Sequence, residues 1–264
     1  MKNKLLYNPS FEHDSCGIGA IANIDGRQNH QTINDALSML ENMEHRGGTG
    51  ADPETGDGAG ILLQLNRPLL EMLLDDADLK SESEKFVGVG MLFLSKHKSV
   101  AKESLELLEK NAEDLNLNIL GYREVPVDQK VPGVGAKPVE PTIKQVFIQS
   151  KDKLSEVELE RKLFVLRNYT SHQIGKELEA NNKAFYVCSM SCRNLIYKGQ
   201  LRTNQLRIYY KDLQNPEFKT AFAIVHSRFS TNTFPNWKLA QPFHYIAHNG
   251  EINTIRGNVT KMKS

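Results

Sequence analysis

Apolar residues recur along the chain at two spacings, and these predict a set of strands and a set of helices. Nearly continuous apolar runs are typical of buried strands, and they cover residues 17–22, 59–65, 86–94, 119–125, 144–149, 184–189, 193–197, 220–226 and 243–247. Apolar positions every three or four residues are typical of amphipathic helices, and they cover residues 32–44, 68–74, 100–115 and 154–178. Strands come in pairs and helices in pairs, which favours sheets packed under helices over a doubly wound parallel sheet.

Length, charge and cysteine content narrow the class of protein. A chain of 264 residues can bury a full core, so one large domain is expected. The formal net charge of +1 provides no single-sign field that would attract nucleic acid or an anionic membrane surface. No apolar stretch approaches the ~20 residues of a membrane helix, and residues 1–15 lack the apolar centre of a secretory signal. Three cysteines form no disulfide framework, so we expect a cytoplasmic protein.

Cys16 is the first candidate for chemistry, because it lies between the polar leader, residues 1–15, and the apolar run 17–22. A cysteine at such a junction is either inert packing or a nucleophile. Cys188 and Cys192 have no partner pair at zinc-finger spacing, so we expect buried strand cysteines and no metal site there. A thiol–imidazole dyad with Cys16 stays open, the histidines near motifs being His13, His45, His226, His244 and His248.

Two segments near the end of the chain supply groups that suit catalysis on an amide. Arg228 follows an apolar strand and precedes hydroxyl residues, and its planar fork suits a carboxylate. The alternative is an arginine on a solvated rim. Asn249-Gly250 also follows an apolar run, where it predicts either a tight hairpin turn or an oxyanion hole formed by the side-chain amide and the Gly250 backbone N–H.

A glycine-rich loop over residues 44–60 is the third candidate. It contains His45-Arg46-Gly47-Gly48 and Gly56-Asp57-Gly58-Ala59-Gly60. Its spacing fits neither the P-loop nor the dinucleotide fingerprint, so a close-packed substrate loop is favoured over a phosphate site.

These segments together resemble the amino-terminal glutaminase domain of glutamate synthase large chains, which are class II glutamine amidotransferases. The matching blocks run in the expected order from residue 7 to about 258: Tyr7-Asn8-Pro9, Glu12-His13-Asp14-Ser15-Cys16-Gly17, His45-Arg46-Gly47, Thr49-Gly50-Ala51-Asp52, Thr55-Gly56-Asp57-Gly58-Ala59-Gly60, Ser227-Arg228-Phe229-Ser230-Thr231-Asn232-Thr233, Pro235-Asn236-Trp237 and His248-Asn249-Gly250-Glu251-Ile252-Asn253-Thr254. Residues 95–180 carry no sharp signature of this kind.

The resemblance implies an α+β fold of the N-terminal-nucleophile hydrolase type, a four-layer αββα sandwich over residues 16–264. By position, Cys16 is the nucleophile and becomes the first residue after autocatalytic removal of the leader, residues 1–15. Arg228 binds the glutamine α-carboxylate, and Asn249 and Gly250 form the oxyanion hole. The substrate-side roles of Thr231 and Arg46 are weaker assignments.

Elementary chemistry agrees with removal of the leader. A thiol with an ordinary pKa of ~8.5 needs a base at neutral pH, and a free α-amine with a pKa of ~8 on the same residue supplies one. While Ser15 is attached, that nitrogen is an amide and cannot accept the proton. Thiolate attack on the glutamine amide then gives a glutamyl thioester and ammonia, and hydrolysis gives glutamate.

The resemblance also implies partners outside this chain. L-Glutamine is the substrate, and ammonia is channelled to 2-oxoglutarate in a synthase domain of the full-length protein. FMN and an iron–sulfur cluster are expected in that full-length protein, and no cofactor is expected in this chain. The electron donor stays open between NADPH, NADH and ferredoxin, and so does the presence of a small NADPH-oxidising subunit.

One feature of the family is not matched, and two rival functions stay open. The family's aspartate that binds the glutamine α-amino group has no position before Ser264, so we expect a C-terminally truncated fragment. One rival is a class II amidotransferase that serves a sugar phosphate or aspartate. The other is a non-catalytic binding domain with an inert Cys16.

Overall fold

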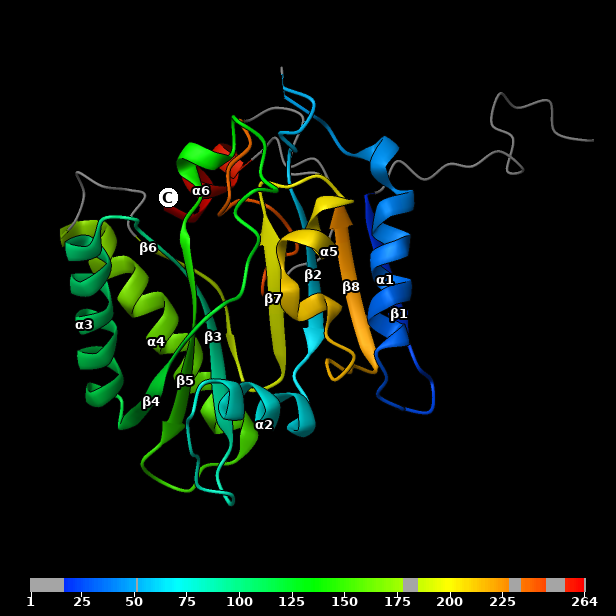
Figure 1. Ribbon diagram of the computed structural model, residues 1–264. Helices are drawn as coiled ribbons and strands as arrows, with labels where there is room; N and C mark the ends of the chain where they lie inside the picture. Colours follow the sequence, from blue (N-terminus) through cyan, green and yellow to red (C-terminus); the bar gives the residue numbers. More distant parts are fainter. Residues whose placement is uncertain (1–16, 51, 178–184, 228–233, 246–254, 264) are drawn as a thin grey trace, which may run out of the picture.

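The computed structural model describes residues 17–50, 52–177, 185–227, 234–245 and 255–263 (Figure 1). Within these residues, eight strands form two sheets of four strands, and every pairing is antiparallel. The first sheet has the order β1 (Ile18–Ala22), β8 (Phe222–Ser227), β2 (Ala59–Gln64), β7 (Asn194–Gly199). The second has the order β4 (Leu117–Glu124), β5 (Thr142–Ser150), β3 (Val87–Leu94), β6 (Phe185–Ser191).

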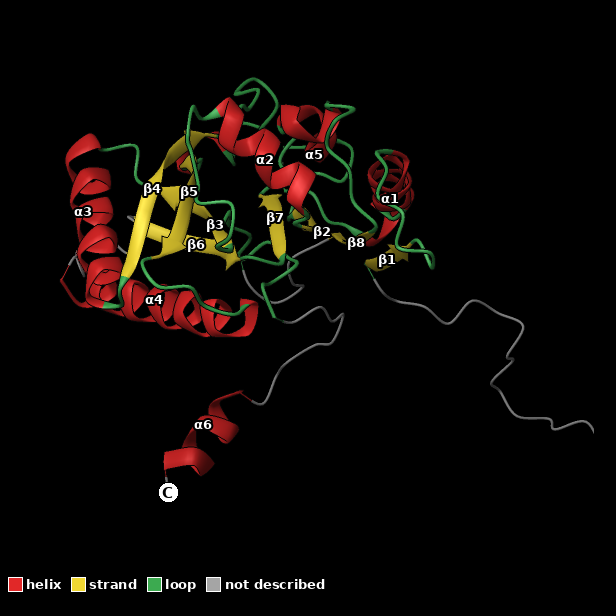
Figure 2. Cartoon of the chain, turned by 90° about the horizontal axis from the view of Figure 1, so that it is seen from below, coloured by secondary structure: helices red, strands yellow, loops and turns green. Residues whose placement is uncertain are grey.

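Helices lie on both sides of the strands (Figure 2). They are α1 (Gln31–Asn42), α2 (Arg67–Asp76), α3 (Lys98–Asp114), α4 (Glu156–Glu177), α5 (Gln205–Tyr209) and α6 (Ile255–Lys263), with 3₁₀ turns at Glu44–Arg46, Lys137–Val139 and Lys211–Gln214. In Figure 2, α1, α2 and α5 lie on one side of the strands and α4 on the other. None of the helices in the described ranges is long and apolar enough to cross a membrane.

Two apolar clusters hold these layers together. The larger joins α1, α2 and α5 to strands of both sheets, with Leu37, Ile61 and Phe147 fully buried in it. The smaller packs α3 and α4 against the other face of the second sheet, through residues such as Leu108 and Leu163. Burying a leucine or phenylalanine side chain contributes about 1.5–3 kcal/mol, so these two clusters supply most of the driving force.

Local sequence explains where the elements begin. The side chain of Asn66 accepts the backbone N–H of Leu69 at 2.9 Å and so caps α2, with Pro68 in its first turn. Strand β3 is buried along its whole length, as expected for an interior strand that has helices on one face and the main core on the other.

The α+β class predicted from the sequence is confirmed, and so are the helices and all but one of the predicted strands. The exception is residues 243–247: residues 243–245 do not form a strand, and 246–247 lie outside the described residues. Side chains hold this part of the chain in place of a ladder. The Phe243 ring packs against the Lys198 ammonium, and the His244 imidazole accepts the backbone N–H of Met190 at 3.3 Å.

A buried guanidinium ties the two sheets together. Arg123 on β4 donates two hydrogen bonds to the carboxylate of Asp212, with N–O distances of 2.7 and 2.8 Å. It donates a third to Gln145 on β5 at 3.0 Å. Tyr197 on β7, in the other sheet, donates to Asp212 at 2.8 Å and accepts from Gln145 at 3.2 Å. Burial and then the negative charge of Asp212 hold the pKa of Tyr197 well above its ordinary value, so this hydroxyl stays a donor.

Asp212→Asn should lower the free energy of unfolding by about 3–5 kcal/mol, because it removes the buried charge partner of the Arg123 guanidinium and leaves it with the exposed Asp76. Urea unfolding followed by circular dichroism measures the change. Asp76→Asn is the matched control, since Asp76 pairs with the same guanidinium but keeps 59% of its side chain exposed. That variant should lose no more than about 1 kcal/mol. Equal losses in the two variants would contradict the view that burial makes Asp212 the dominant partner.

Candidate functional site

Most of the residues predicted to act in catalysis lie outside the described part of the chain. Cys16, Arg228, Thr231, Asn249 and Gly250 belong to this group. Arg46 is described and ends the 3₁₀ turn Glu44–Arg46, half-buried. The described residues that adjoin them in the chain define where the site lies.

The junctions to Cys16 and Arg228 lie side by side at one edge of the first sheet. Strands β1 and β8 are antiparallel neighbours, with Ile18 opposite His226. Beyond that pair, the backbone N–H of Ser227 donates to the carbonyl of Gly17 at 2.5 Å. A Cβ on Gly17 would lie 2.2 Å from the Ser227 carbonyl oxygen, so only glycine permits this approach. The start of β1 and the end of β8, some 210 residues apart in the sequence, therefore lie next to each other.

The loop that carries Arg46 packs against the same edge. A Cβ on Gly47 would lie 3.1 Å from the Ser227 hydroxyl oxygen. A Cβ on Gly48 would clash with the carboxylate of Asp57, and one on Gly56 with the backbone of Leu201. The close packing predicted for this loop is confirmed by these contacts, and its role as a substrate loop stays a prediction. An acidic side chain against Gly48 is also the wrong charge for a phosphate cradle.

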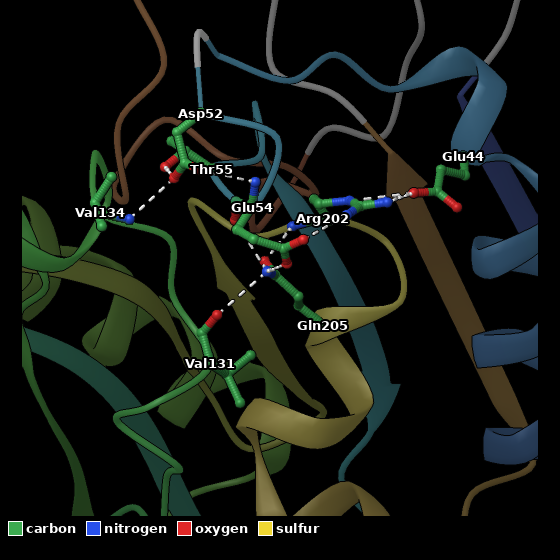
Figure 3. Close-up of polar contacts among 8 residues, drawn as sticks. All are labelled: Glu44, Asp52, Glu54, Thr55, Val131, Val134, Arg202 and Gln205. Carbon is green, nitrogen blue, oxygen red and sulfur yellow. Dashed lines mark hydrogen bonds and ion pairs between the residues drawn. The ribbon is translucent and has the colours of Figure 1, made fainter.

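A set of polar contacts fixes this loop from the outside (Figure 3). Arg202 forms ion pairs with Glu44, which precedes Arg46, and with Glu54 at 3.4 Å. Gln205 at the start of α5 donates to the backbone carbonyls of Glu54 at 2.9 Å and Val131 at 3.2 Å. The loop is thus held at Glu44 and at Glu54 by residues that follow β7.

Asp52 and Thr55 form the inner joint of the loop. The Thr55 hydroxyl donates to Asp52 at 2.7 Å, and the Asp52 carboxylate also accepts the backbone N–H of Val134 at 3.0 Å, as Figure 3 shows. The Thr55 hydroxyl, followed by backbone N–H groups, holds the pKa of Asp52 below its usual value. Asp52 therefore stays ionised at neutral pH and keeps these contacts.

A cavity of about 210 Å³ opens where the loop meets the sheet edge. The described residues that line it are Glu44, His45, Gly47, Gly48, Thr49, Gly58, Leu201, Arg202, Thr203 and Ser227. Pockets that bind drug-sized ligands have volumes of ~300–1,000 Å³, so this cavity suits a smaller molecule. A larger cavity of about 700 Å³ lies at the opposite ends of the same strands, near Gln64 and Asn194, and none of the residues adjacent to Cys16, Arg46 or Arg228 in the chain lines it. The smaller cavity is the candidate site.

The two described cysteines are unsuited to nucleophilic attack. Cys188 is fully buried, and burial raises the pKa of its thiol to about 12. Burial, and then the neighbouring Glu160, also raises the pKa of Cys192. No group of three His, Cys, Asp or Glu side chains that could hold a metal ion occurs among the described residues. The prediction of a buried strand cysteine is confirmed for Cys188 on β6. It is wrong for Cys192, which lies just after the end of β6 and is half-buried.

The described histidines differ in their surroundings. His45 is exposed, and its ring lies 3.1 Å from the Asn42 carbonyl. His244 is buried beside Arg167, and burial followed by the positive charge of Arg167 lowers its pKa to about 3. It is therefore a neutral acceptor at pH 7. A dyad with Cys16 stays untested, because Cys16 lies outside the described residues.

Comparison with known proteins identifies the family of the chain. Residues 16–264 match the family model described as glutamine amidotransferases class-II. The chain belongs to this family. Among class II amidotransferases it is 44% identical to the ferredoxin-dependent glutamate synthase of Pyropia yezoensis and 43% identical to the NADH glutamate synthase of Saccharomyces cerevisiae. It is 42% identical to the large chain of the NADPH glutamate synthase of Bacillus subtilis.

These alignments cover nearly all of this chain and a small part of each relative. They span 96%, 98% and 98% of the chain, and 16%, 12% and 17% of the respective relatives. The resemblance drawn from the sequence blocks is confirmed at the level of the family. Sequence reasoning did not identify Arg202, because an arginine in a loop carries no distinctive pattern. The glycines of the run 17–22 indicate that another part of the chain approaches closely, but they do not identify Ser227 as the partner of Gly17.

Gly17→Ala should lower the free energy of unfolding by about 1–3 kcal/mol, because the added methyl group forces β1 away from the Ser227 carbonyl. Denaturant unfolding measures the change. Gly175→Ala is the control: it sits exposed in α4 with open space around its Cβ, so the same change should stabilise by about 0.5–1 kcal/mol. Gly17→Ala as stable as the wild type would show that the close approach imposes no requirement for glycine.

Proposed function

We propose that this chain hydrolyses glutamine to glutamate and ammonia, as the glutaminase part of a glutamate synthase, with Cys16 as the nucleophile. The observation that carries the proposal is the convergence of Gly17, Ser227 and the loop after Arg46 on one sheet edge. Gly17, which follows Cys16, and Ser227, which precedes Arg228, therefore lie together beside the cavity. The family match also begins at Cys16, which supports a mature protein without residues 1–15.

The reaction in this proposal begins with the free α-amine of Cys16. It takes the proton of the thiol, and the thiolate attacks the side-chain carbonyl carbon of glutamine. The C–N bond then breaks, and the nitrogen leaves as ammonia after receiving that proton. Water cleaves the resulting thioester, which restores the thiol and releases glutamate. Cys188 and Cys192 take no part in this reaction, because Cys188 is fully buried, Cys192 is half-buried, and both thiols have raised pKa values.

The remaining site residues divide between binding and charge stabilisation. Arg228 would pair with the α-carboxylate of glutamine through two parallel hydrogen bonds. The Asn249 amide and the Gly250 backbone N–H would stabilise the oxyanion of the tetrahedral intermediate. Thr231 and Arg46 would border the substrate. The position of the Arg46 loop against Ser227 supports this last assignment.

The reaction of the whole protein reaches beyond this chain. The ammonia would pass to 2-oxoglutarate in a synthase domain of the same full-length protein. FMN and an iron–sulfur cluster would belong to that domain, and no step proposed for this chain uses them. The relatives' names give ferredoxin, NADH and NADPH as donors, so they leave the donor of this protein open, and with it a small NADPH-oxidising subunit. We expect the cytoplasm as its compartment.

Two finer points accompany this function. We infer that the two sheets and their helices belong to a four-layer αββα sandwich, as in N-terminal-nucleophile hydrolases. A class II amidotransferase that serves a sugar phosphate or aspartate is the nearest rival. The relatives named above are all glutamate synthases, which favours 2-oxoglutarate as the acceptor.

Cys16→Ser should lower glutamine hydrolysis at least ~10³-fold, because the hydroxyl is a far weaker nucleophile than the thiol near pH 7. The assay follows glutamate formed from glutamine by the full-length protein. Mass spectrometry of the wild-type amino terminus should give Cys16 as the first residue.

Cys192→Ser is the control for this experiment. It should keep near-normal activity, since the Cys192 thiol lies against the Glu156 carbonyl at the start of α4 and has a raised pKa. A wild-type protein that retains residues 1–15 yet hydrolyses glutamine at full rate would contradict the role of the Cys16 amine. Loss of activity in Cys192→Ser alone would contradict the choice of nucleophile.

Asn249→Asp distinguishes an oxyanion hole from a hairpin turn. Asp-Gly suits a tight turn as well as Asn-Gly does, so a turn residue would tolerate the change. An oxyanion donor would not, and kcat should fall by roughly 10²–10³-fold with a much smaller change in KM. Steady-state kinetics measure both constants, with thermal unfolding recorded in parallel.

The control here is Asn236→Asp, which adds the same charge thirteen residues earlier in the chain. Its side-chain oxygen accepts the backbone N–H of Leu239 at 3.0 Å, a role that Asp also fills, so activity should be unchanged. A normal kcat in Asn249→Asp would assign the segment to a turn.

A further inference from the structure

Lys198 on β7 is a fully buried cation in an unusual setting. Its relative exposure is 0%, and among the described residues no carboxylate forms an ion pair with it. Burial of a charge without a partner of opposite sign costs several kcal/mol. A lysine in this position therefore needs compensating contacts.

The compensating contacts come from backbone carbonyls and aromatic rings. The Lys198 ammonium donates to the carbonyls of Ala240 at 2.7 Å and Lys238 at 3.0 Å, and to the Tyr186 hydroxyl at 3.2 Å. It also lies 4.9 Å from the ring centres of Tyr186 and Phe243. An ammonium has three N–H donors, and each is matched by one acceptor.

Two of those acceptors belong to residues 237–245, which we call the crossing segment. It contains no helix and no strand, so no ladder fixes it in place. The segment begins ten residues after the end of β8. It leads directly into residues 246–254, which include Asn249 and Gly250. Its last residue, Tyr245, is thus joined through the chain to the proposed oxyanion donors.

Other contacts hold the crossing segment at its two ends. The Trp237 indole N–H donates to the Ala136 carbonyl at 3.0 Å. The His244 ring accepts the Met190 backbone N–H. Between these ends, a Cβ on Gly60 would lie 2.4 Å from the Gln241 carbonyl, so the segment lies tightly on β2. Lys198 supplies the polar contacts in the middle, where no other side chain among the described residues donates to the segment's carbonyls.

The charge state of Lys198 suits this role at neutral pH. Burial lowers its pKa to about 8, and the positive charge of Arg167 on α4 acts in the same direction. The buried Cys188 thiol on β6 is the other titratable group that influences it. The amine therefore remains protonated at pH 7 and keeps its three donors.

We propose that Lys198 is a positioning residue for glutamine hydrolysis: it fixes the crossing segment through the carbonyls of Lys238 and Ala240, and this segment leads along the chain to Asn249 and Gly250, the proposed oxyanion donors. This inference rests on the proposed function. An oxyanion donor works only within a narrow geometry, and a displacement of about 1 Å can cost ~10²-fold in rate. Substrate binding through Arg228 would not depend on Lys198.

Lys198→Met in the full-length protein tests the proposal, because methionine retains the apolar stem and removes the donors. We expect kcat for glutamine hydrolysis to fall ~10–100-fold and KM to change less than ~3-fold. Hydrogen exchange should become faster in peptides that cover residues 237–245 and stay unchanged in β3. Lys144→Met is the matched control, since Lys144 lies on β5 and pairs with Glu124. It should alter neither measurement.

A second variant covers the case in which Lys198→Met does not fold. Gly60→Ala pushes on the Gln241 carbonyl from the neighbouring strand, and it should produce the same loss of kcat and the same faster exchange. Folded Lys198→Met with normal kcat, or with unchanged exchange in residues 237–245, would overturn the positioning role. A wild-type protein without glutaminase activity would overturn the proposed function instead, while the exchange data would still decide whether Lys198 fixes the segment.

Discussion

The buried pair between Arg123 and Asp212 is the interaction on which the relation of the two sheets depends. Arg123 belongs to the second sheet, and Asp212 also binds Tyr197 of the first. A guanidinium in this position has to satisfy its donors within a fixed geometry, because an unpaired buried charge costs several kcal/mol. Apolar contacts tolerate small sliding of one sheet on another, whereas a bidentate ion pair does not. The pair therefore selects one arrangement of the sheets among several that bury similar apolar area.

That fixed arrangement matters because the candidate site lies at the end of the first sheet. The Gly17–Ser227 contact is made between backbones, and the loop after Arg46 packs on the same residue. Backbone contacts leave little freedom for compensation by side-chain movement. Small residues at these positions are therefore part of the site, although none of them carries a reactive group. The glycines bring segments that are distant in the sequence close enough to share one cavity.

Much of this architecture could be predicted from the sequence, and the reasons are physical. Strands such as β3 and helices such as α1 follow from apolar periodicity, which acts over a few residues. Residues 243–247 show the limit of this rule. They are apolar enough for a strand, but Phe243 and His244 are held by Lys198 and Met190 from other elements. The spacing of apolar residues indicates that a segment is buried, but it does not indicate which other element packs against it.

The same limit explains why Lys198 was not found from the sequence. A lysine near the end of an apolar strand is usually solvent-exposed, and its local pattern gives no reason to expect otherwise. Its role depends on two carbonyls some forty residues later, in a segment without regular structure. Catalytic groups can be recognised from their chemistry, because few residue types perform it. Groups that position them act through contacts that only the folded chain defines. A buried charge without an oppositely charged partner is the feature that reveals such a group, since folding would favour an apolar residue there unless the charge held something in place.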